Sequence, residues 1–192
     1  MTSRFPSPRV VRRVRLGTSA ADESTLVDVH LADGRITGIH PASAIDERAD
    51  EGAAERPAGG VIDGRGLLAL PGLVNAHAHV DKSWWGLPWQ SYGGEGGTEG
   101  RIRHERARRD ELGIPSVEIT RRVLAEFVRH GTTAIRTHVD VDPGVGLRGI
   151  EAVRAAVAEY DGALTVQIVA FPQDGVLRRP GVLELLADAA RA

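Results

Sequence analysis

LPGLVNAHAHVDKSW, residues 70–84, places two histidines one residue apart at the end of a short apolar run. Alternate residues of a β-strand point to the same side, so His77 and His79 are expected to project together. The run from Leu73 to Ala76 is typical of a strand in a parallel sheet that is buried on both faces. In parallel α/β folds, functional groups gather beyond the carboxyl ends of the strands. The stretch therefore predicts an α/β fold with a functional histidine pair at a strand end.

Strands and helices alternate after this stretch. Residues 132–141 and 164–171 have the apolar, β-branched composition of strands, and a long polar, glycine-rich loop is expected between about 82 and 100. The expected helices span residues 101–112, 116–129 with Ser116 as the N-cap, 147–160 and 181–192. This alternation predicts three βα units around a parallel sheet.

The residues before the stretch form a different pattern. Residues 10–39 have the composition of strands, including a hairpin in which Leu26–Leu31 and Arg35–Ile39 are joined around Asp33-Gly34. Residues 41–60 are rich in Ala, Pro, Gly and acids, which predicts a surface loop. We therefore expect two domains, over residues 1–70 and 71–192.

Composition limits the chemistry. The 192 residues carry 24 Lys and Arg against 26 Asp and Glu, and they contain no cysteine. Disulfides, thiolate metal sites and cysteine nucleophiles are therefore excluded, and a metal would need His, Asp or Glu ligands. No apolar run approaches the ~20 residues of a membrane span, and the Arg-rich start lacks the apolar core of a secretory signal. A cytoplasmic location is the default expectation.

The histidine pair has two interpretations. Two neutral imidazoles on one strand can bind one divalent ion at roughly 2.0–2.1 Å each. The alternative is a pair of structural histidines without a ligand. A buried strand before the pair, Asp81 on the same side after it, and the long loop that follows favour the metal.

Polar residues also mark the ends of the later strands. His138 and Asp140 form a second i, i+2 pair at the end of residues 132–141. Gln167 interrupts the apolar strand 164–171, and an unpaired buried amide costs about 1–3 kcal/mol. Gln167 is therefore expected either to bond neighbouring backbone or to contact a ligand.

Three motifs carry a resemblance to a known family. LPGLVNAHAHVDKSW, GTTAIRTHVDVDP (residues 131–143) and LTVQIVAFPQDG (residues 164–175) resemble the amidohydrolase superfamily, and within it the bacterial cytosine deaminase branch. The resemblance implies an α/β fold with a partial (β/α)8 TIM barrel. Residues 71–192 would be its first three βα units, and residues 1–70 would supply N-terminal strands of a small β-sandwich.

The resemblance also implies a reaction. It implies one divalent metal ion, iron or zinc, held by His77 and His79, with Gln167 contacting a pyrimidine-like substrate. Asp81, Trp84, His138 and Asp140 are expected to line the site. A divalent metal lowers the pKa of the water it binds to about 7, which suits hydrolytic removal of an amine from a pyrimidine-like or triazine-like ring.

The family's other functional residues have no counterpart in these three units. They are a histidine from the fifth strand, an aspartate from the eighth, and a glutamate and histidine that transfer protons. We therefore expect the chain to correspond to an N-terminal portion, inactive by itself and without catalytic residues of its own. No nucleic-acid or membrane partner is expected, and a homo-oligomer is compatible with the full-length enzyme.

A binding module is the competing interpretation. RVVRRVRL (residues 9–16) and RIRHERARRD (residues 101–110) are basic, as nucleic-acid contacts require. Acidic residues interleave with the arginines of the second segment, which is typical of a solvated helix face. An inactive α/β binding module or a nucleic-acid-binding domain is thus the alternative.

Overall fold

The chain divides into two compact units, Met1–Pro71 and Gly72–Ala192. The computed structural model describes residues 9–17, 25–42, 60–160 and 162–192, so most of the expected loop over residues 41–60 lies outside the described residues. Within those ranges, none of the helices has the length and apolar composition needed to cross a membrane.

The N-terminal unit is a five-stranded sheet. Strands β1 to β4 have the order β3-β2-β1-β4, and β5 also pairs with β1. Their bounds are β1 Val10–Leu16, β2 Val27–Ala32, β3 Arg35–Pro41, β4 Val61–Asp63 and β5 Leu68–Ala69. Ala32 pairs with Arg35, and Asp33 and Gly34 between them have φ of 52° and 73°. This is the left-handed geometry of a tight hairpin turn, so the predicted hairpin is confirmed.

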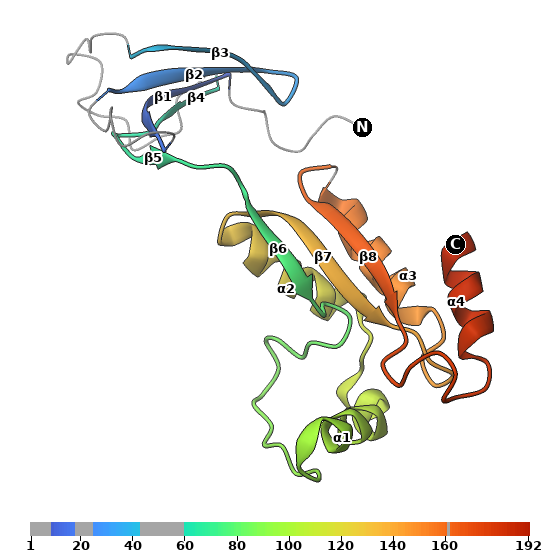
Figure 1. Cartoon of the computed structure of the whole chain (residues 1–192). Coiled ribbons are helices and arrows are strands. Elements are labelled where there is room, and N and C mark those ends of the chain that lie inside the picture. Colours follow the sequence, from blue (N-terminus) through green and yellow to red (C-terminus); the bar gives the residue numbers. More distant parts are fainter. Residues whose placement is uncertain (1–8, 18–24, 43–59, 161) are drawn as a thin grey trace. The chain divides into compact units, whose positions relative to one another are not determined.

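The Gly72–Ala192 unit is a parallel α/β layer. Its sheet has the order β6-β7-β8, with both pairs parallel, as the alternation predicts. Figure 1 shows helices α2 and α3 lying against one side of this sheet. The bounds are β6 Leu73–Ala78, α1 Gly97–Leu112, α2 Val117–Arg129, β7 Thr132–Asp140, α3 Arg148–Val157, η2 Ala158–Tyr160, β8 Thr165–Phe171 and α4 Val182–Arg191.

Helix bounds follow the sequence signals closely in α2 and α4 and less closely in α1 and α3. The Ser116 hydroxyl accepts a hydrogen bond from the backbone N–H of Ile119, which confirms the predicted N-cap. Helix α1 begins at Gly97, earlier than the expected residue 101. The helix expected over residues 147–160 ends as α-helix at Val157 and continues as one 3₁₀ turn.

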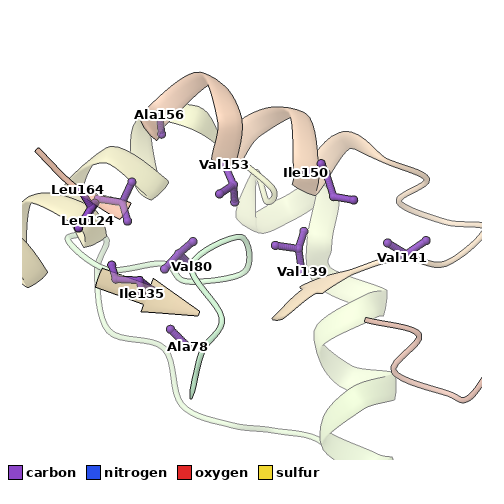
Figure 2. Packing of buried hydrophobic residues seen from close by; sticks show 10 residues of the cluster. All are labelled: Ala78, Val80, Leu124, Ile135, Val139, Val141, Ile150, Val153, Ala156 and Leu164. Atoms are coloured by element: carbon purple, nitrogen blue, oxygen red, sulfur yellow. The ribbon is translucent and has the colours of Figure 1, made fainter. Parts of the chain in front are cut away.

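A hydrophobic core lies between the sheet and its helices. Leu124 of α2, Val139 of β7 and Val153 of α3 are each 0% exposed. Figure 2 shows these side chains converging from the helices and the strand, with Ile135 and Ile150 beside them. Along β7, alternate residues face this core, so Arg136 and His138 lie on the opposite face of the sheet.

The start of β6 departs from the prediction. The sequence indicated a strand buried on both faces, but Leu73 is 55% and Val74 71% exposed. Strand β6 is an edge of the described sheet. The core cluster includes Ala78 and Val80, at and after the end of the strand, but not the residues at its start. The prediction was wrong because burial of an apolar strand depends on neighbours that its own residues do not specify.

Candidate metal centre

The two predicted ligands point toward each other. His77 is the fifth residue of β6, and His79 lies one residue beyond that strand. Their Nε2 atoms are 3.4 Å apart. Two nitrogens bound to one ion at ~2.0–2.1 Å, with a tetrahedral angle between them, would be about 3.3–3.4 Å apart. The pair therefore has the spacing of two ligands of one cation, and the same spacing also suits a single imidazole–imidazole hydrogen bond.

Two further rings complete a cluster on the face away from the core. His138 of β7 stacks on His77, with ring centroids 4.3 Å apart and an interplanar angle of 25°. Phe171, at the end of β8, lies 5.7 Å from both His79 and His138. The ends of all three strands thus contribute a ring to the same place.

Within the described part of the chain, the candidate donor set is the histidine pair. Among the residues that the structure describes, no three His, Cys, Asp or Glu side chains are grouped so that they could hold a metal ion. The Nδ1 atom of His138 is buried and has no hydrogen-bond partner within those residues. Catalytic zinc normally takes three protein ligands, so this pair fits a divalent ion as part of a ligand set.

The surroundings of His79 favour its neutral form. Burial lowers the pKa of His79, and the positive charge of Lys82 lowers the same pKa further. Metal binding requires a deprotonated ring nitrogen. The electrostatics at His79 therefore act in the direction that a metal ligand needs.

Asp81 holds the end of β6 to β7. It is 4% exposed, and its Oδ2 accepts a hydrogen bond from the backbone N–H of Asp140 at 3.0 Å. Burial raises the pKa of Asp81 to about 6. The sequence predicts Asp81 as a residue lining the site, and the structure gives its carboxyl a backbone partner on the neighbouring strand.

Asp140 lies in a buried ion-pair cluster. Lys82 Nζ is 3.1 Å from its Oδ1, and Arg109 Nη2 of α1 is 2.8 Å from its Oδ2. Arg109 also donates from Nη1 to Asp142 Oδ2 at 2.8 Å. Two cations therefore neutralise the carboxylate that the sequence placed beside His138 as a site-lining group.

Arg109 is the residue that sequence reasoning missed. Its segment was interpreted as a solvated helix face, but Arg109 is 7% exposed. An arginine can be buried when carboxylates pair with it, and Asp140 and Asp142 do so from 31 and 33 residues away. A repeat of aspartates at a strand end, opposite a basic helix, is the signal that could have indicated this contact.

The predicted substrate residue is in a different environment from the one expected. Gln167 is exposed rather than buried, because it lies on the face of β8 away from the helices. Its Oε1 accepts a hydrogen bond from Arg136 Nε at 2.6 Å, and Arg136 is its register partner on β7. The buried-amide expectation was therefore wrong, although Gln167 does share the sheet face of His138.

The loop after β6 carries exposed aromatic side chains. Trp84 is 37%, Trp85 58% and Trp89 84% exposed. Within the described residues, the rings in contact with the histidine pair are His138 and Phe171, so Trp84 is near them in sequence without joining their cluster. Its predicted role at the site stays a prediction.

The basic segment of α1 is paired with acids. Arg103 forms an ion pair with Glu95, Arg106 with Asp174, and Arg108 with Glu111 at 2.7 Å. These pairs neutralise charges that a nucleic-acid backbone would otherwise contact. These ion pairs do not test nucleic-acid binding, so the expectation that the chain has no nucleic-acid partner stays a prediction.

Comparisons with known proteins show which proteins this chain is similar to. No protein-family model matches the chain. The chain is 35% identical over 127 residues to N-isopropylammelide isopropyl amidohydrolase of Pseudomonas sp. (strain ADP), covering 59% of this chain and 29% of that enzyme.

Two solved structures resemble the fold. N-isopropylammelide isopropylaminohydrolase from Burkholderia multivorans ATCC 17616 matches 95% of this chain and 42% of its own, with TM-score 0.76 and 37% identity. The 5-methylcytosine deaminase from Klebsiella pneumoniae, liganded with 5-fluorocytosine, matches 95% of this chain and 41% of its own, with TM-score 0.66 and 27% identity. The chain spans about a third of the length of the curated relatives that it matches.

Proposed function

The chain belongs to the amidohydrolase superfamily, in its cytosine deaminase-like branch, and on this premise we propose that Gly72–Ala192 forms the first three βα units of a (β/α)8 barrel. The residues before them would contribute strands of a small β-sandwich. The parallel order β6-β7-β8 and the polar ring cluster at the strand ends support this assignment.

The proposed activity is metal-dependent hydrolysis of a C–N bond on a nitrogen heterocycle, carried out by the longer protein of which such units are part. His77 and His79 would hold a divalent ion, iron or zinc, which lowers the pKa of water and supplies a nucleophile at neutral pH. The single observation that carries the proposal is the 3.4 Å between the two Nε2 atoms on the open face of the sheet.

The remaining residues of this chain would bind and orient the substrate. Gln167 accepts from Arg136, which leaves its amide N–H₂ free to donate to a ring nitrogen or a carbonyl oxygen of a pyrimidine-like or triazine-like ring. Phe171 and His138 present ring faces and edges beside the histidine pair. Proton transfer to the leaving amine needs an acid, which we assign to no described residue of this chain.

The test of this proposal is retention of metal by the purified chain. The double variant His77→Ala/His79→Ala is expected to abolish binding of Zn²⁺ or Co²⁺ that the parent retains, measured by equilibrium dialysis with metal analysis. His30→Ala/His40→Ala is the matched control, because that pair also lies with ring centroids 5.0 Å apart, on the N-terminal sheet. Equal binding by the parent and the His77/His79 variant would refute the ligand assignment.

A further inference from the structure

The backbone that carries His79 extends beyond the strand ladder. The last paired residues of β6 and β7 are Ala78 and Thr137, so His79 lies just beyond the ladder, and side-chain hydrogen bonds hold the residues that follow it. The backbone N–H of Val80 donates to Thr137 Oγ1 at 3.1 Å, and Thr120 Oγ1 of α2 donates to the Val80 carbonyl at 3.2 Å. These bonds fasten the segment on the helix side of the sheet.

Lys82 fastens the same segment at the strand ends. Its ammonium donates to both carboxylate oxygens of Asp140, at 3.1 and 3.3 Å, and to Gln173 Oε1 just after β8 at 2.5 Å. Glu105 of α1 lies 3.6 Å from it. One side chain thus joins the end of β6 to the ends of both other strands and to α1.

The environment of Lys82 requires a cation at this point. The Lys82 side chain is 15% exposed, and the Asp140 side chain is 3% exposed. Removing one cationic partner from a buried carboxylate costs free energy. The pairing with Asp140 therefore holds the Lys82 ammonium in place independently of the loop that follows. Lys82 is also the single lysine of the sequence, in which arginine supplies the other positive side chains.

We propose that Lys82 is a positioning residue, which fixes the segment after β6 so that the His79 ring meets the His77 ring at metal-binding distance. This inference rests on the proposed function of the histidine pair. Lys82 acts through the backbone of the segment it ends, and it does not itself contact either ring. Outer contacts that orient metal ligands typically change metal affinity by roughly 10- to 100-fold when they are removed.

The experiment compares three variants of the full chain. Lys82→Met removes the charge and the donors, Lys82→Arg keeps both, and Arg106→Met is the matched control. Arg106 belongs to the same cluster: among the described residues its ion pairs are to Asp142 and Asp174 rather than to Asp140. We expect Lys82→Met to bind Co²⁺ roughly 10- to 100-fold more weakly than the parent, and Lys82→Arg and Arg106→Met to bind it as the parent does.

A second measurement follows the rings without metal. Nuclear Overhauser contacts between the ring protons of His77, His79 and His138 report the cluster geometry directly, recorded at a pH where the imidazoles are neutral. They are expected in the parent, in Lys82→Arg and in Arg106→Met, and lost between His77 and His79 in Lys82→Met. The His30–His40 contact of the N-terminal sheet serves as an internal reference in every sample.

The outcomes separate this inference from the proposed function. Unchanged contacts between His77 and His79 in Lys82→Met overturn the inference, and so does an equal loss in Arg106→Met. If the parent binds no Co²⁺ through its histidines, the metal proposal fails and the ring contacts alone decide the role of Lys82. If Lys82→Met does not fold, Lys82→Gln replaces it. Its shorter, uncharged side chain cannot bridge Asp140, Gln173 and Glu105 together, so the His77–His79 contact is expected to weaken relative to Lys82→Arg, and an unchanged contact overturns the inference.

Discussion

Thr137→Val should destabilise the chain through one buried hydrogen bond. Valine matches threonine in shape, so the packing around position 137 is preserved while the hydroxyl is lost. That hydroxyl accepts from the backbone N–H of Val80 at 3.1 Å, and the two residues are 0% and 1% exposed. Water cannot replace the lost acceptor, so the free energy of unfolding should fall by about 1–3 kcal/mol.

The assay is thermal and urea unfolding followed by circular dichroism. For a chain of this length each kcal/mol shifts the melting temperature by about 2–4 °C, which gives an expected fall of roughly 2–12 °C. Thr133→Val is the matched control, because Thr133 lies in the same strand β7 and its side chain is exposed. That control should change the free energy of unfolding by less than ~0.5 kcal/mol.

A null result in this comparison would be informative. If Thr137→Val unfolds as Thr133→Val does, the Val80 N–H has another acceptor in solution. The segment after β6 would then not be fastened by Thr137, and the description of how His79 is held beyond the strand ladder would be refuted.

Two further predictions concern the core and the ion-pair cluster. Leu124→Ala should lower the free energy of unfolding in urea by about 2–5 kcal/mol, because Leu124 is 0% exposed. The control Leu183→Ala, at a 58% exposed position, should change the free energy of unfolding by less than ~0.5 kcal/mol. Similar losses in both variants would contradict the core assignment. Burial raises the pKa of Asp142, but the hydrogen bond and charge of Arg109 outweigh it and leave that pKa below its usual value. Because the folded pKa is the lower one, the stabilising contribution is present above the unfolded value of about 3.9 and is lost as the pH falls through the folded value. The stability difference between the parent and Asp142→Asn should therefore be largest near neutral pH and shrink below about pH 4; a pH-independent difference in urea unfolding would contradict this sign.

Local sequence patterns were enough for features that depend on neighbouring residues. The hairpin at Asp33-Gly34 and the start of α2 at Ser116 follow from turn and capping chemistry within a few residues. The two-residue period of a strand predicts the common direction of His77 and His79, and their Nε2 atoms lie 3.4 Å apart although His79 lies one residue beyond β6. The alternation of strands and helices likewise predicts the parallel sheet.

Features that depend on distant residues needed the tertiary structure. Gln167 and Arg136 are 31 residues apart in sequence, and their hydrogen bond pairs the glutamine amide. The position of Gln167 on the face of β8 away from the helices explains why it is exposed. Arg109 also needed the tertiary structure. The charge pattern of its helix predicts an exposed side chain, but Arg109 is buried because Asp140 and Asp142 at the end of β7 pair with it.

The sequence alone thus determined the elements of this protein and the residue pair at the end of β6, because periodicity, capping and turn chemistry act over a few residues. The tertiary structure decided which polar groups at the strand ends stay open and which neutralise one another. The charged cluster forms where β6 and β7 end beside α1. Lys82 follows β6, Arg109 lies in α1, and Asp140 and Asp142 lie at and just after the end of β7. The free energy of burying each charge depends on whether its partner lies close by, and a local sequence pattern does not specify partners from distant segments.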